Sequence, residues 1–474
     1  MVMAVIGIVI LLLPFGITAQ GYLPPDDVLR HAAFGVTNRT WGEILIGRPE
    51  ALFDQSPGWH VILRTIHKLT GCSPEGLATL SIVGMLMIFL LIGHPYVKRW
   101  ESWAMALGMF FLADPALIKR FTLGRPFILT SVIIVVLLGD SREKQLRPWW
   151  CPRHGIWLAL AAISAWVHGS WYLLLMAPCA LLLAGRFQEA VRMGTILIVG
   201  VLLGGIISGH PLRYLSGEIT HLLSALESHS IPSLVMELGP GHQPLLPLGV
   251  VALVALPSFL MGLRPWGLKD PVLLFALITW VLGYFYVWRF YLDFCFPLLA
   301  IWVAWRLDEI KDLLPKISSR RWISVLFAAG LLIVATLPNR SGRWSVDGSA
   351  GALDAHIPNE AILLPEPGGV AYSNSMQFFY QTFFRNPNGD WRYILGYEPG
   401  LMNCQDRAVY FALSQGSDPN LALAPWIAKM TRKDRMILYG PSDHPPPISS
   451  LAWSKAGRSR WSGRLSDEHN SASR

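Results

Sequence analysis

Two adjacent carboxylates, Asp26 and Asp27, follow directly on the first apolar run, in the stretch "QGYLPPDDVLRHAAF" at residues 20–34. A carboxylate placed where a chain leaves a membrane can act as a general base towards a hydroxyl group, or it can bind a divalent cation. The alternative is a helix cap, because Asp after Pro is a common signal for a helix start. We therefore expect one aspartate to cap the following helix and the other to be left for chemistry.

Three cations, Lys119, Arg120 and Arg125, lie close together in "ADPALIKRFTLGRPF". A phosphate group is their natural partner, since arginine offers planar bidentate donors and lysine a point charge. Anionic lipid headgroups are the alternative partner.

Other polar side chains at expected helix ends are Arg289, His60 and His168. Arg289 stands beside Trp288 and Tyr291, where snorkelling alone also explains an arginine. His168, in "AWVHGSWY", and His60 can meet a cavity, although a lone interfacial histidine more often has a structural role. Arg30, close behind the acidic pair, completes the set of predicted substrate-binding residues.

The elements that must position these residues are membrane helices. The chain has 474 residues, of which 53% are hydrophobic and 15% charged, which is too apolar for a soluble protein of this length. About eleven runs approach the roughly 20 residues that span a bilayer. The clearest are residues 2–18, 77–93, 126–139, 193–208, 246–263, 271–288, 291–306 and 322–338.

The remaining runs are less distinct. Segment 102–113 is short, and segment 155–185 is one long helix or, as we prefer, two helices joined at "WVHGSW". The first run, 2–18, resembles a cleaved signal peptide at "ITA", but it lacks a basic N-terminal region, so we expect a retained helix.

Positive charge alternates between the short loops. Loops of one parity carry Lys98, Arg99, Arg142, Lys144, Arg147, Arg153, Arg186, Arg192, Arg264, Lys269, Arg306, Lys311, Lys316, Arg320 and Arg321. Those of the other parity carry fewer: Lys119, Arg120, Arg125, Arg213 and Arg289. The positive-inside rule puts the first set in the cytoplasm and therefore predicts a multi-pass protein of the cytoplasmic (inner) membrane. The acidic pair, the 209–245 loop and everything beyond residue 339 are then extracytoplasmic.

The net charge of +8 is largely this topological signal, so it does not indicate nucleic-acid binding. None of the five cysteines has metal-ligand spacing. A disulfide between Cys72 and Cys404 is permitted by compartment, but we expect unpaired thiols.

The composition divides the chain into residues 1–338, a transmembrane domain whose outer loop 19–76 carries the acidic pair; residues 339–466, a small extracytoplasmic α/β domain; and a disordered tail, 467–474. In the second domain, "AILLPEP", "GVAYSN" and "RMILYG" are typical of strands, and "DRAVYFALSQG" and "LAPWIAKMT" of helices. In loop 19–76, "DDVLRHAAF" and "WHVILRTIHKLTG" predict two amphipathic helices lying at the membrane surface.

The outer loop resembles the first outer loop of GT-C glycosyltransferases, especially the protein mannosyltransferase and aminoarabinose transferase branch. In that branch an acidic pair precedes a "PPxxYxL…G" stretch. Here the pair is Asp26-Asp27, and in "SPGWHVILRTIHKLTG" Pro57 matches one family proline, Ser56 replaces the other, and His60 stands where an aromatic residue is common.

A second likeness lies in "VWRFYLDFCFPLLAIWVAW", which is similar to the family's "RYxLPxxPxLxLLxA". Arg289 and Pro297 match the family's arginine and second proline, and Asp293 replaces the first proline. The two likenesses span the membrane body but not the tail domain.

The resemblance implies a GT-C-like fold and transfer of a sugar from a polyprenyl-phosphate-linked donor to an acceptor protein, lipid or glycan at the outer face. It implies Asp27, more than Asp26, as general base or as ligand of a divalent metal, and Arg289 as a ligand of the lipid phosphate.

Two alternatives stay open: a lipid-linked glycan carrier or flippase, and an O-antigen polymerase or ligase. A carrier predicts charged or helix-breaking residues near mid-membrane, and a polymerase or ligase predicts a large basic loop late in the body. The acidic pair after the first run favours the transferase.

Overall fold

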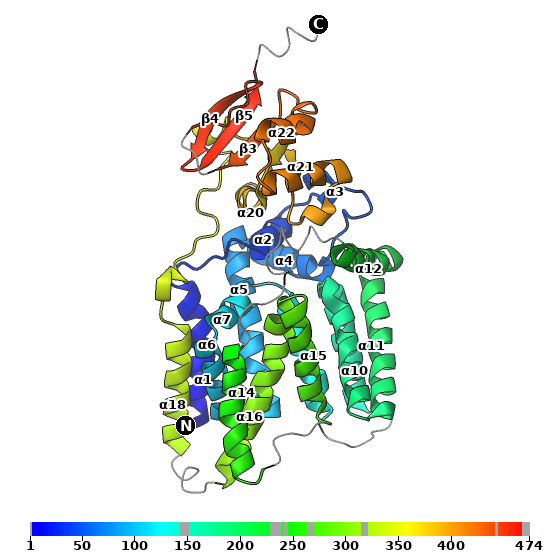
Figure 1. Cartoon of the computed structure of the whole chain (residues 1–474), viewed down its shortest axis with the longest axis vertical. Helices are drawn as coiled ribbons and strands as arrows, with labels where there is room; N and C mark the ends of the chain where they lie inside the picture. Colours follow the sequence, from blue (N-terminus) through cyan, green and yellow to red (C-terminus); the bar gives the residue numbers. More distant parts are fainter. Residues whose placement is uncertain are drawn as a thin grey trace.

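The computed structural model describes residues 2–142, 151–227, 239, 245–263, 269–313, 321–440 and 444–466. Its lower part is a bundle of helices and its upper part is a smaller domain with a sheet (Figure 1). The expected disordered tail, 467–474, lies outside the described residues.

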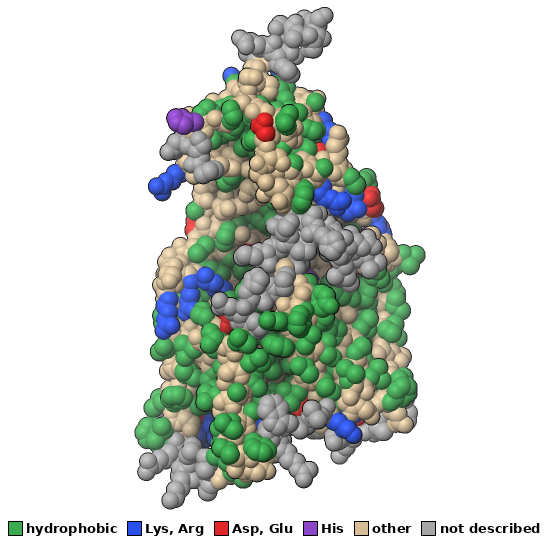
Figure 2. Space-filling model, in the orientation of Figure 1, with side chains coloured by type: hydrophobic (Ala, Val, Ile, Leu, Met, Phe, Trp, Pro, Cys, Tyr) green, Lys and Arg blue, Asp and Glu red, His purple; other side chains and the backbone are tan. Residues whose placement is uncertain are grey.

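The bundle is built from the apolar runs of the sequence. Its helices are α1 (Val2–Thr18), α5 (Pro74–Leu91), α6 (Trp100–Ala113), α8 (Phe127–Asp140), α9 (Pro152–Val167), α10 (Met176–Leu183), α11 (Phe187–Ile207), α14 (Leu245–Leu260), α15 (Pro271–Phe285), α16 (Phe296–Leu313) and α18 (Arg321–Thr336). On the face shown in Figure 2, hydrophobic side chains dominate the surface of the bundle, and the charged ones in view lie towards its ends. These outward-facing apolar helices indicate a membrane protein.

By length and composition, three described segments can cross a membrane: Pro74–Tyr96, Phe187–Ile207 and Phe290–Leu313. A fourth span results if α6 and α7 (Pro115–Phe121), which meet at 113°, are taken together. The other apolar helices have 10–17 residues, fewer than the roughly 20 that a straight span needs. The expected number of about eleven membrane helices is therefore not confirmed.

Segment 155–185 is two helices, as expected. Helix α9 ends at Val167, a 3₁₀ segment η2 (Gly169–Leu175) follows, and α10 begins at Met176. The break puts His168 at the upper end of the bundle. The first helix, α1, packs through Ile6, Ile10 and Leu13, which are buried against its neighbours.

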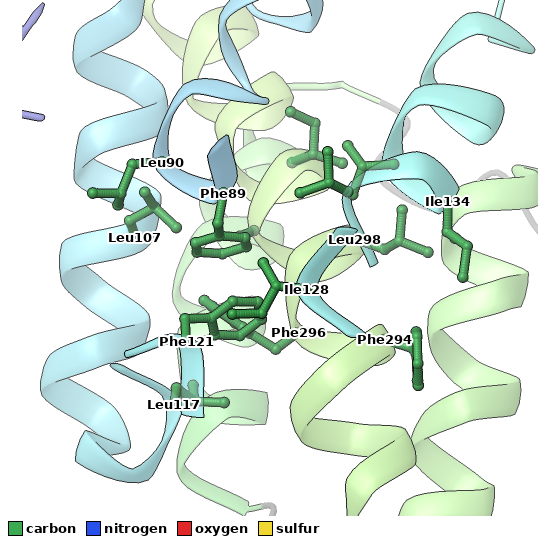
Figure 3. Close-up of a cluster of buried hydrophobic side chains, with 14 of the residues drawn as sticks. Phe89, Leu90, Leu107, Leu117, Phe121, Ile128, Ile134, Phe294, Phe296 and Leu298 are labelled. Atoms are coloured by element: carbon green, nitrogen blue, oxygen red, sulfur yellow. The ribbon is translucent and has the colours of Figure 1, made fainter. Parts of the chain in front are cut away.

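Aromatic side chains fill the interior of the bundle (Figure 3). Phe89 on α5 stacks on Phe121 of α7 at 3.8 Å, and Phe296 on α16 contacts both rings. Burying Phe121 and its neighbours Leu117 and Ile118 anchors the short helix α7 inside the bundle. This packing fixes the segment that carries Lys119, Arg120 and, just beyond, Arg125.

Ion pairs close the lower end of the bundle. Lys98 and Arg99 both contact Asp312, at 2.8 and 2.7 Å, and Arg321 contacts Glu101 at 2.9 Å. Lys98, Arg99 and Arg321, which belong to the basic set, thus lie at one end of the bundle, and helix α2 with the acidic pair lies at the other (Figure 1). The membrane side of each end stays a prediction.

Four helices lie at the upper end of the bundle: α2 (Asp27–Val36), α3 (Trp41–Ile44), α4 (Pro57–Thr70) and α12 (Pro211–Glu227). We expected α2 and α4 to lie at the membrane surface, and for α2 this is wrong, because residues Val28–Gly35 are all buried. Helix α2 lies between the bundle and the upper domain (Figure 1), and its small residues Ala32, Ala33 and Gly35 permit close packing on both sides.

The upper domain contains a five-stranded sheet in the order β2-β1-β3-β5-β4. Its strands are β1 (Gly369–Ser373), β2 (Trp391–Tyr393), β3 (Arg435–Tyr439), β4 (Leu451–Gly457) and β5 (Arg460–Leu465); β1 pairs in parallel with β2 and β3, and β5 pairs antiparallel with β3 and β4. Its helices are α19 (Pro358–Ala361), α20 (Met376–Arg385), α21 (Cys404–Ser414) and α22 (Pro419–Ile427).

The expected strands at "GVAYSN" and "RMILYG" are β1 and β3, but "AILLPEP" is not a strand. Its first residue ends α19, and turns follow. Pro365 and Pro367 lack the N–H groups that a sheet ladder needs, and Ile362 is exposed. Strands β2, β4 and β5 were not predicted.

The outer loop shares a core with the upper domain. Phe34, Trp41 and Ile44 lie in one buried cluster with Phe379 and Phe383 of α20. Isolated parallel bridges pair Leu23 with Asp347 and Leu45 with Tyr393. Residues distant in sequence thus form one unit above the bundle.

Candidate functional site

The acidic pair opens helix α2. Asp26 is the N-cap, with an extended backbone, and its carboxylate accepts a hydrogen bond from the Asp27 N–H at 2.5 Å. Asp27 is the first helical residue, a position where a negative charge suits the helix dipole. One member of the pair is therefore a cap, and the Asp27 carboxylate is directed to other partners.

Three cationic or polar groups surround the Asp27 carboxylate. Arg30 Nε lies 2.6 Å from Oδ1, Arg125 Nε lies 3.3 Å from Oδ2, and the Tyr380 hydroxyl of α20 lies 3.1 Å from Oδ1. Arg125 also contacts Asp26. Burial disfavours the charged form of Asp27, but Arg30, Arg125 and His31 outweigh it and hold the pKa of this carboxyl well below its usual range.

Arg125 reaches the pair because of the turn before it. Gly124 has φ +65°, and a Cβ there would lie 3.0 Å from Val28 of α2 and from Ile82 of α5. Only glycine adopts this backbone at so close an approach without cost. The turn between α7 and α8 thereby brings the arginine to the start of α2.

Arg30, Arg125 and Arg289 act on one neighbouring side chain, His168. Burial first, and then the positive charges of Arg289 and Arg30, lower the pKa of His168 to about 3. Its Nδ1 accepts a hydrogen bond from the Ser170 N–H at 3.1 Å, which leaves the ring proton of the neutral form on Nε2. Arginines from three separate segments therefore lie near His168, and two of them, Arg30 and Arg125, also contact Asp27.

The other two cations of the predicted cluster lie elsewhere. Arg120 forms a buried ion pair with Asp293, with Nε 2.5 Å from Oδ1 and Nη2 2.9 Å from Oδ2. Asp293, which stands where the family has a proline, belongs to a π-helical turn, η4 (Phe290–Cys295), and also lies 3.7 Å from Arg289 Nε. Lys119 is exposed. The structure therefore brings Arg125, but not Arg120, to the acidic pair.

His60, on α4, is buried and lies between two polar partners. Its Nδ1 lies 2.8 Å from Asp54 and its Nε2 lies 2.8 Å from His31 Nδ1. The predicted site residues Asp26, Asp27, Arg30, Arg125, His60, His168 and Arg289 thus all lie at the upper end of the bundle.

Four residues near the pair were not predicted: His31, Asp54, Tyr380 and Tyr397. The Tyr397 ring stacks under the Arg30 guanidinium at 4.0 Å. A sequence signal existed for His31, which follows Asp27 by four residues and therefore shares its helix face. The tyrosines come from the tail domain, and no local pattern ties them to α2.

Among the described residues, no group of three or more His, Cys, Asp or Glu side chains is placed to hold a metal ion. All five cysteines are free thiols.

No protein-family model matches the sequence, and no curated protein sequence matches it. Among solved structures, the fold is similar to that of the archaeal oligosaccharyltransferase AglB from Archaeoglobus fulgidus, in complex with an inhibitory peptide and a dolichol-phosphate. The TM-score is 0.50 at 12% sequence identity, and the match covers 88% of this chain and 66% of AglB. The likeness is one of fold, a helical bundle with a small sheet-containing domain, and it does not confirm the mannosyltransferase or aminoarabinose transferase branch.

Proposed function

We propose that this protein is a membrane glycosyltransferase that moves a sugar from a polyprenyl-phosphate-linked donor to an acceptor protein, lipid or glycan at the extracytoplasmic face. The observation that carries the proposal is that Arg30 and Arg125 contact the Asp27 carboxylate at the upper end of the bundle, and that both of them and Arg289 act on the neighbouring His168. A lipid-linked donor carries an anionic phosphate at the membrane interface, and its transfer needs cations and a carboxylate at one depth.

In this proposal, Arg125 and Arg289 bind the donor phosphate. Arginine holds two phosphate oxygens at once, and in a partly buried site such charge-assisted hydrogen bonds are strong. The negative charge that develops on the leaving phosphate is stabilised by the same two side chains. Arg125 exchanges its contact with Asp26 for the phosphate when the donor enters.

Asp27 is proposed to bind the acceptor. Its lowered pKa keeps it ionised at neutral pH, and its carboxylate oxygens can accept a hydrogen bond from a hydroxyl group. A divalent cation would use the same oxygens, so transfer is best measured both with Mg²⁺ and with EDTA. The bundle, residues 1–338, then holds the donor, and the domain 339–466 covers the site through Tyr380.

The test is sugar transfer by purified protein in lipid nanodiscs. Undecaprenyl-phosphate-linked mannose, glucose and aminoarabinose, each radiolabelled, are offered with a cell-envelope extract that contains proteins, lipids and glycans. We expect label in one acceptor fraction from at least one donor. No transfer from any donor, together with movement of the intact lipid-linked sugar across liposomes, would favour the carrier.

Asp27→Asn and Asp26→Asn test the carboxylates. Asp27→Asn keeps shape but loses the charge that Arg30 and Arg125 face, so we expect transfer to fall by about 100-fold or more. Asp26→Asn costs less, because Asn also caps helices well. Asp418→Asn is the matched control, since Asp418 is exposed and caps helix α22. Full activity of the Asp26/Asp27 double variant would remove the pair from the mechanism.

A further inference from the structure

Asp54, His60 and His31 form a continuous chain of hydrogen bonds that ends beside the acidic pair. Both Asp54 carboxylate oxygens lie 2.8 Å from His60 Nδ1, and His60 Nε2 lies 2.8 Å from His31 Nδ1. The chain joins three segments: the loop before α4, helix α4 and helix α2. Its last member, His31, follows Asp27 by one helical turn on the same face of α2.

The two histidines of the chain are enclosed, whereas the Asp54 side chain is 27% exposed. His31 and His60 are each 1% exposed. The Phe34 ring lies 4.4 Å from that of His60, and Trp41 stacks on Phe34 at 4.3 Å. Asp54 accepts a further hydrogen bond from the Ser56 N–H at 2.9 Å, which fixes the carboxylate at the start of the chain. Such shielding strengthens each hydrogen bond and keeps the partners in one arrangement.

The charge of Asp54 sets the position of every proton in the chain. Burial opposes ionisation of Asp54, but His60 and the Ser56 N–H lower its pKa below the usual value, so it is an acceptor. His60 must then donate from Nδ1 and, when neutral, accept at Nε2 from His31 Nδ1–H. His31 Nε2 is left unprotonated, and no described residue forms a hydrogen bond with it.

His31 is neutral at neutral pH. Burial, and after it the positive charge of Arg30, holds its pKa well below the usual range. Asp27, one turn away, is ionised and already engaged by two arginines. His31 therefore offers a bare ring nitrogen, whereas the Asp27 oxygens are already held, and the negative Asp54 at the other end of the chain stabilises the charge that His31 gains.

We propose that His31 Nε2 is the proton acceptor of the transfer reaction, and that Asp54 and His60 are positioning residues that fix its tautomer and stabilise its charged form. This inference rests on the proposed function and assigns its base. The acceptor O–H bond breaks and its proton moves to His31 Nε2. A glycosidic bond forms between that oxygen and the anomeric carbon of the sugar. The bond from that carbon to the phosphate oxygen breaks, and its electron pair leaves with the polyprenyl phosphate.

The positive charge formed on His31 is balanced through the chain. The imidazolium donates from Nδ1 to His60, whose other nitrogen donates to the negative Asp54. A purely structural role, in which the chain only joins α2 to α4, is the competing explanation. It makes the same hydrogen bonds, but it needs no base.

The experiment compares His31→Ala with wild type in the nanodisc assay, with and without added imidazole. Imidazole can occupy the vacated ring position and accept a proton, whereas pyrazole has the same size and is a far weaker base. We expect His31→Ala to lower the rate of transfer by about 100-fold with little change in donor KM, and imidazole, but not pyrazole, to restore part of it. His356→Ala, at an exposed histidine of the upper domain, is the control.

Equal rescue by imidazole and pyrazole would show that the ring only fills space, and wild-type activity in His31→Ala would exclude it as base. In both cases wild type still transfers sugar, so only the proposed proton relay of His31, His60 and Asp54 is contradicted. No transfer by wild type would overturn the proposed function and the relay together. If His31→Ala does not fold, ¹⁵N NMR of histidine-labelled wild type gives the tautomer directly: a proton on His31 Nε2 contradicts the relay, and a bare Nε2 that becomes protonated in Asp54→Asn supports it.

Discussion

The Tyr380 hydroxyl lies 3.1 Å from the Asp27 carboxylate, although the two residues are 353 positions apart in the chain. The same hydroxyl lies 3.2 Å from the Tyr397 carbonyl oxygen, and the Tyr397 ring carries the Arg30 guanidinium. The upper domain thus supports both Asp27 and its arginine partner. The site is made jointly by the first outer loop and the last third of the chain.

Tyr380→Phe keeps the ring and removes the hydroxyl that contacts Asp27 and the Tyr397 carbonyl. Hydrogen bonds to charged groups contribute about 1.5–3 kcal/mol, so we expect transfer to fall by roughly 10- to 100-fold with a normal yield of folded protein. Tyr410→Phe, at a buried tyrosine of α21, is the control. Unchanged transfer in Tyr380→Phe would mean that the domain does not tune Asp27.

Arg125→Ala and Arg289→Ala are expected to raise the KM for the lipid-linked donor by at least tenfold, because each removes a bidentate phosphate ligand. The control is Arg340→Ala, since Arg340 is exposed at the same end of the bundle. Equal donor KM in all three variants would assign these arginines to headgroup anchoring instead.

Arg120 has a different expected role. Removing one partner of a buried ion pair costs about 3–5 kcal/mol, so Arg120→Met should lower the melting temperature and the yield markedly. The double variant Arg120→Met/Asp293→Asn should recover much of the stability and keep donor use. Asp293 also lies near Arg289, so the double variant can disturb Arg289 as well. Arg289→Ala therefore shows how much donor use falls when Arg289 alone is lost. A stable double variant that no longer uses the donor would show that Arg120 binds the donor phosphate, as the sequence predicted.

Stability should fall as the pH drops from 7.5 to 5. His168 has a pKa of about 3 in the folded protein, against 6.5 ordinarily, and that of His31 is also lowered. Below about pH 6.5 these histidines therefore bind protons in the unfolded chain but not in the folded protein. The free energy of unfolding then falls by up to about 1.4 kcal/mol per pH unit for each histidine. Asp27 is charged in the folded protein, and the stability that its lowered pKa contributes is also lost as the pH falls, but only below about pH 4. Melting curves of His168→Gln should show a smaller drop than wild type; an equal drop would place the effect elsewhere.

Reporter fusions test the membrane orientation. A reporter after residue 146 should be cytoplasmic and one after residue 345 extracytoplasmic, because of the charge bias between loops. Finding both on the same side would contradict the orientation and the placement of the site at the outer face.

Local patterns in the sequence were sufficient for the bundle and for the cap. Apolar runs predicted the helices, the break at His168 included, and the Pro-Asp pattern predicted that one aspartate would cap α2. Contacts between residues far apart in the sequence could not be predicted from these local patterns. Arg120 and Asp293 are 173 positions apart, and nothing in either segment indicates that one neutralises the other. The full burial of α2 was missed for the same reason, since part of its cover comes from α20, far along the chain.

The shared core of Phe34, Trp41, Phe379 and Phe383 also constrains how the protein is made. The outer loop is synthesised early, but the part of its surface that Phe379 and Phe383 cover stays open until α20 has left the ribosome. Helix α2 must therefore wait, partly uncovered, through the insertion of nearly the whole bundle. A nascent chain cut short before residue 376 leaves that surface open to chaperones and proteases, so only full-length molecules acquire an assembled site.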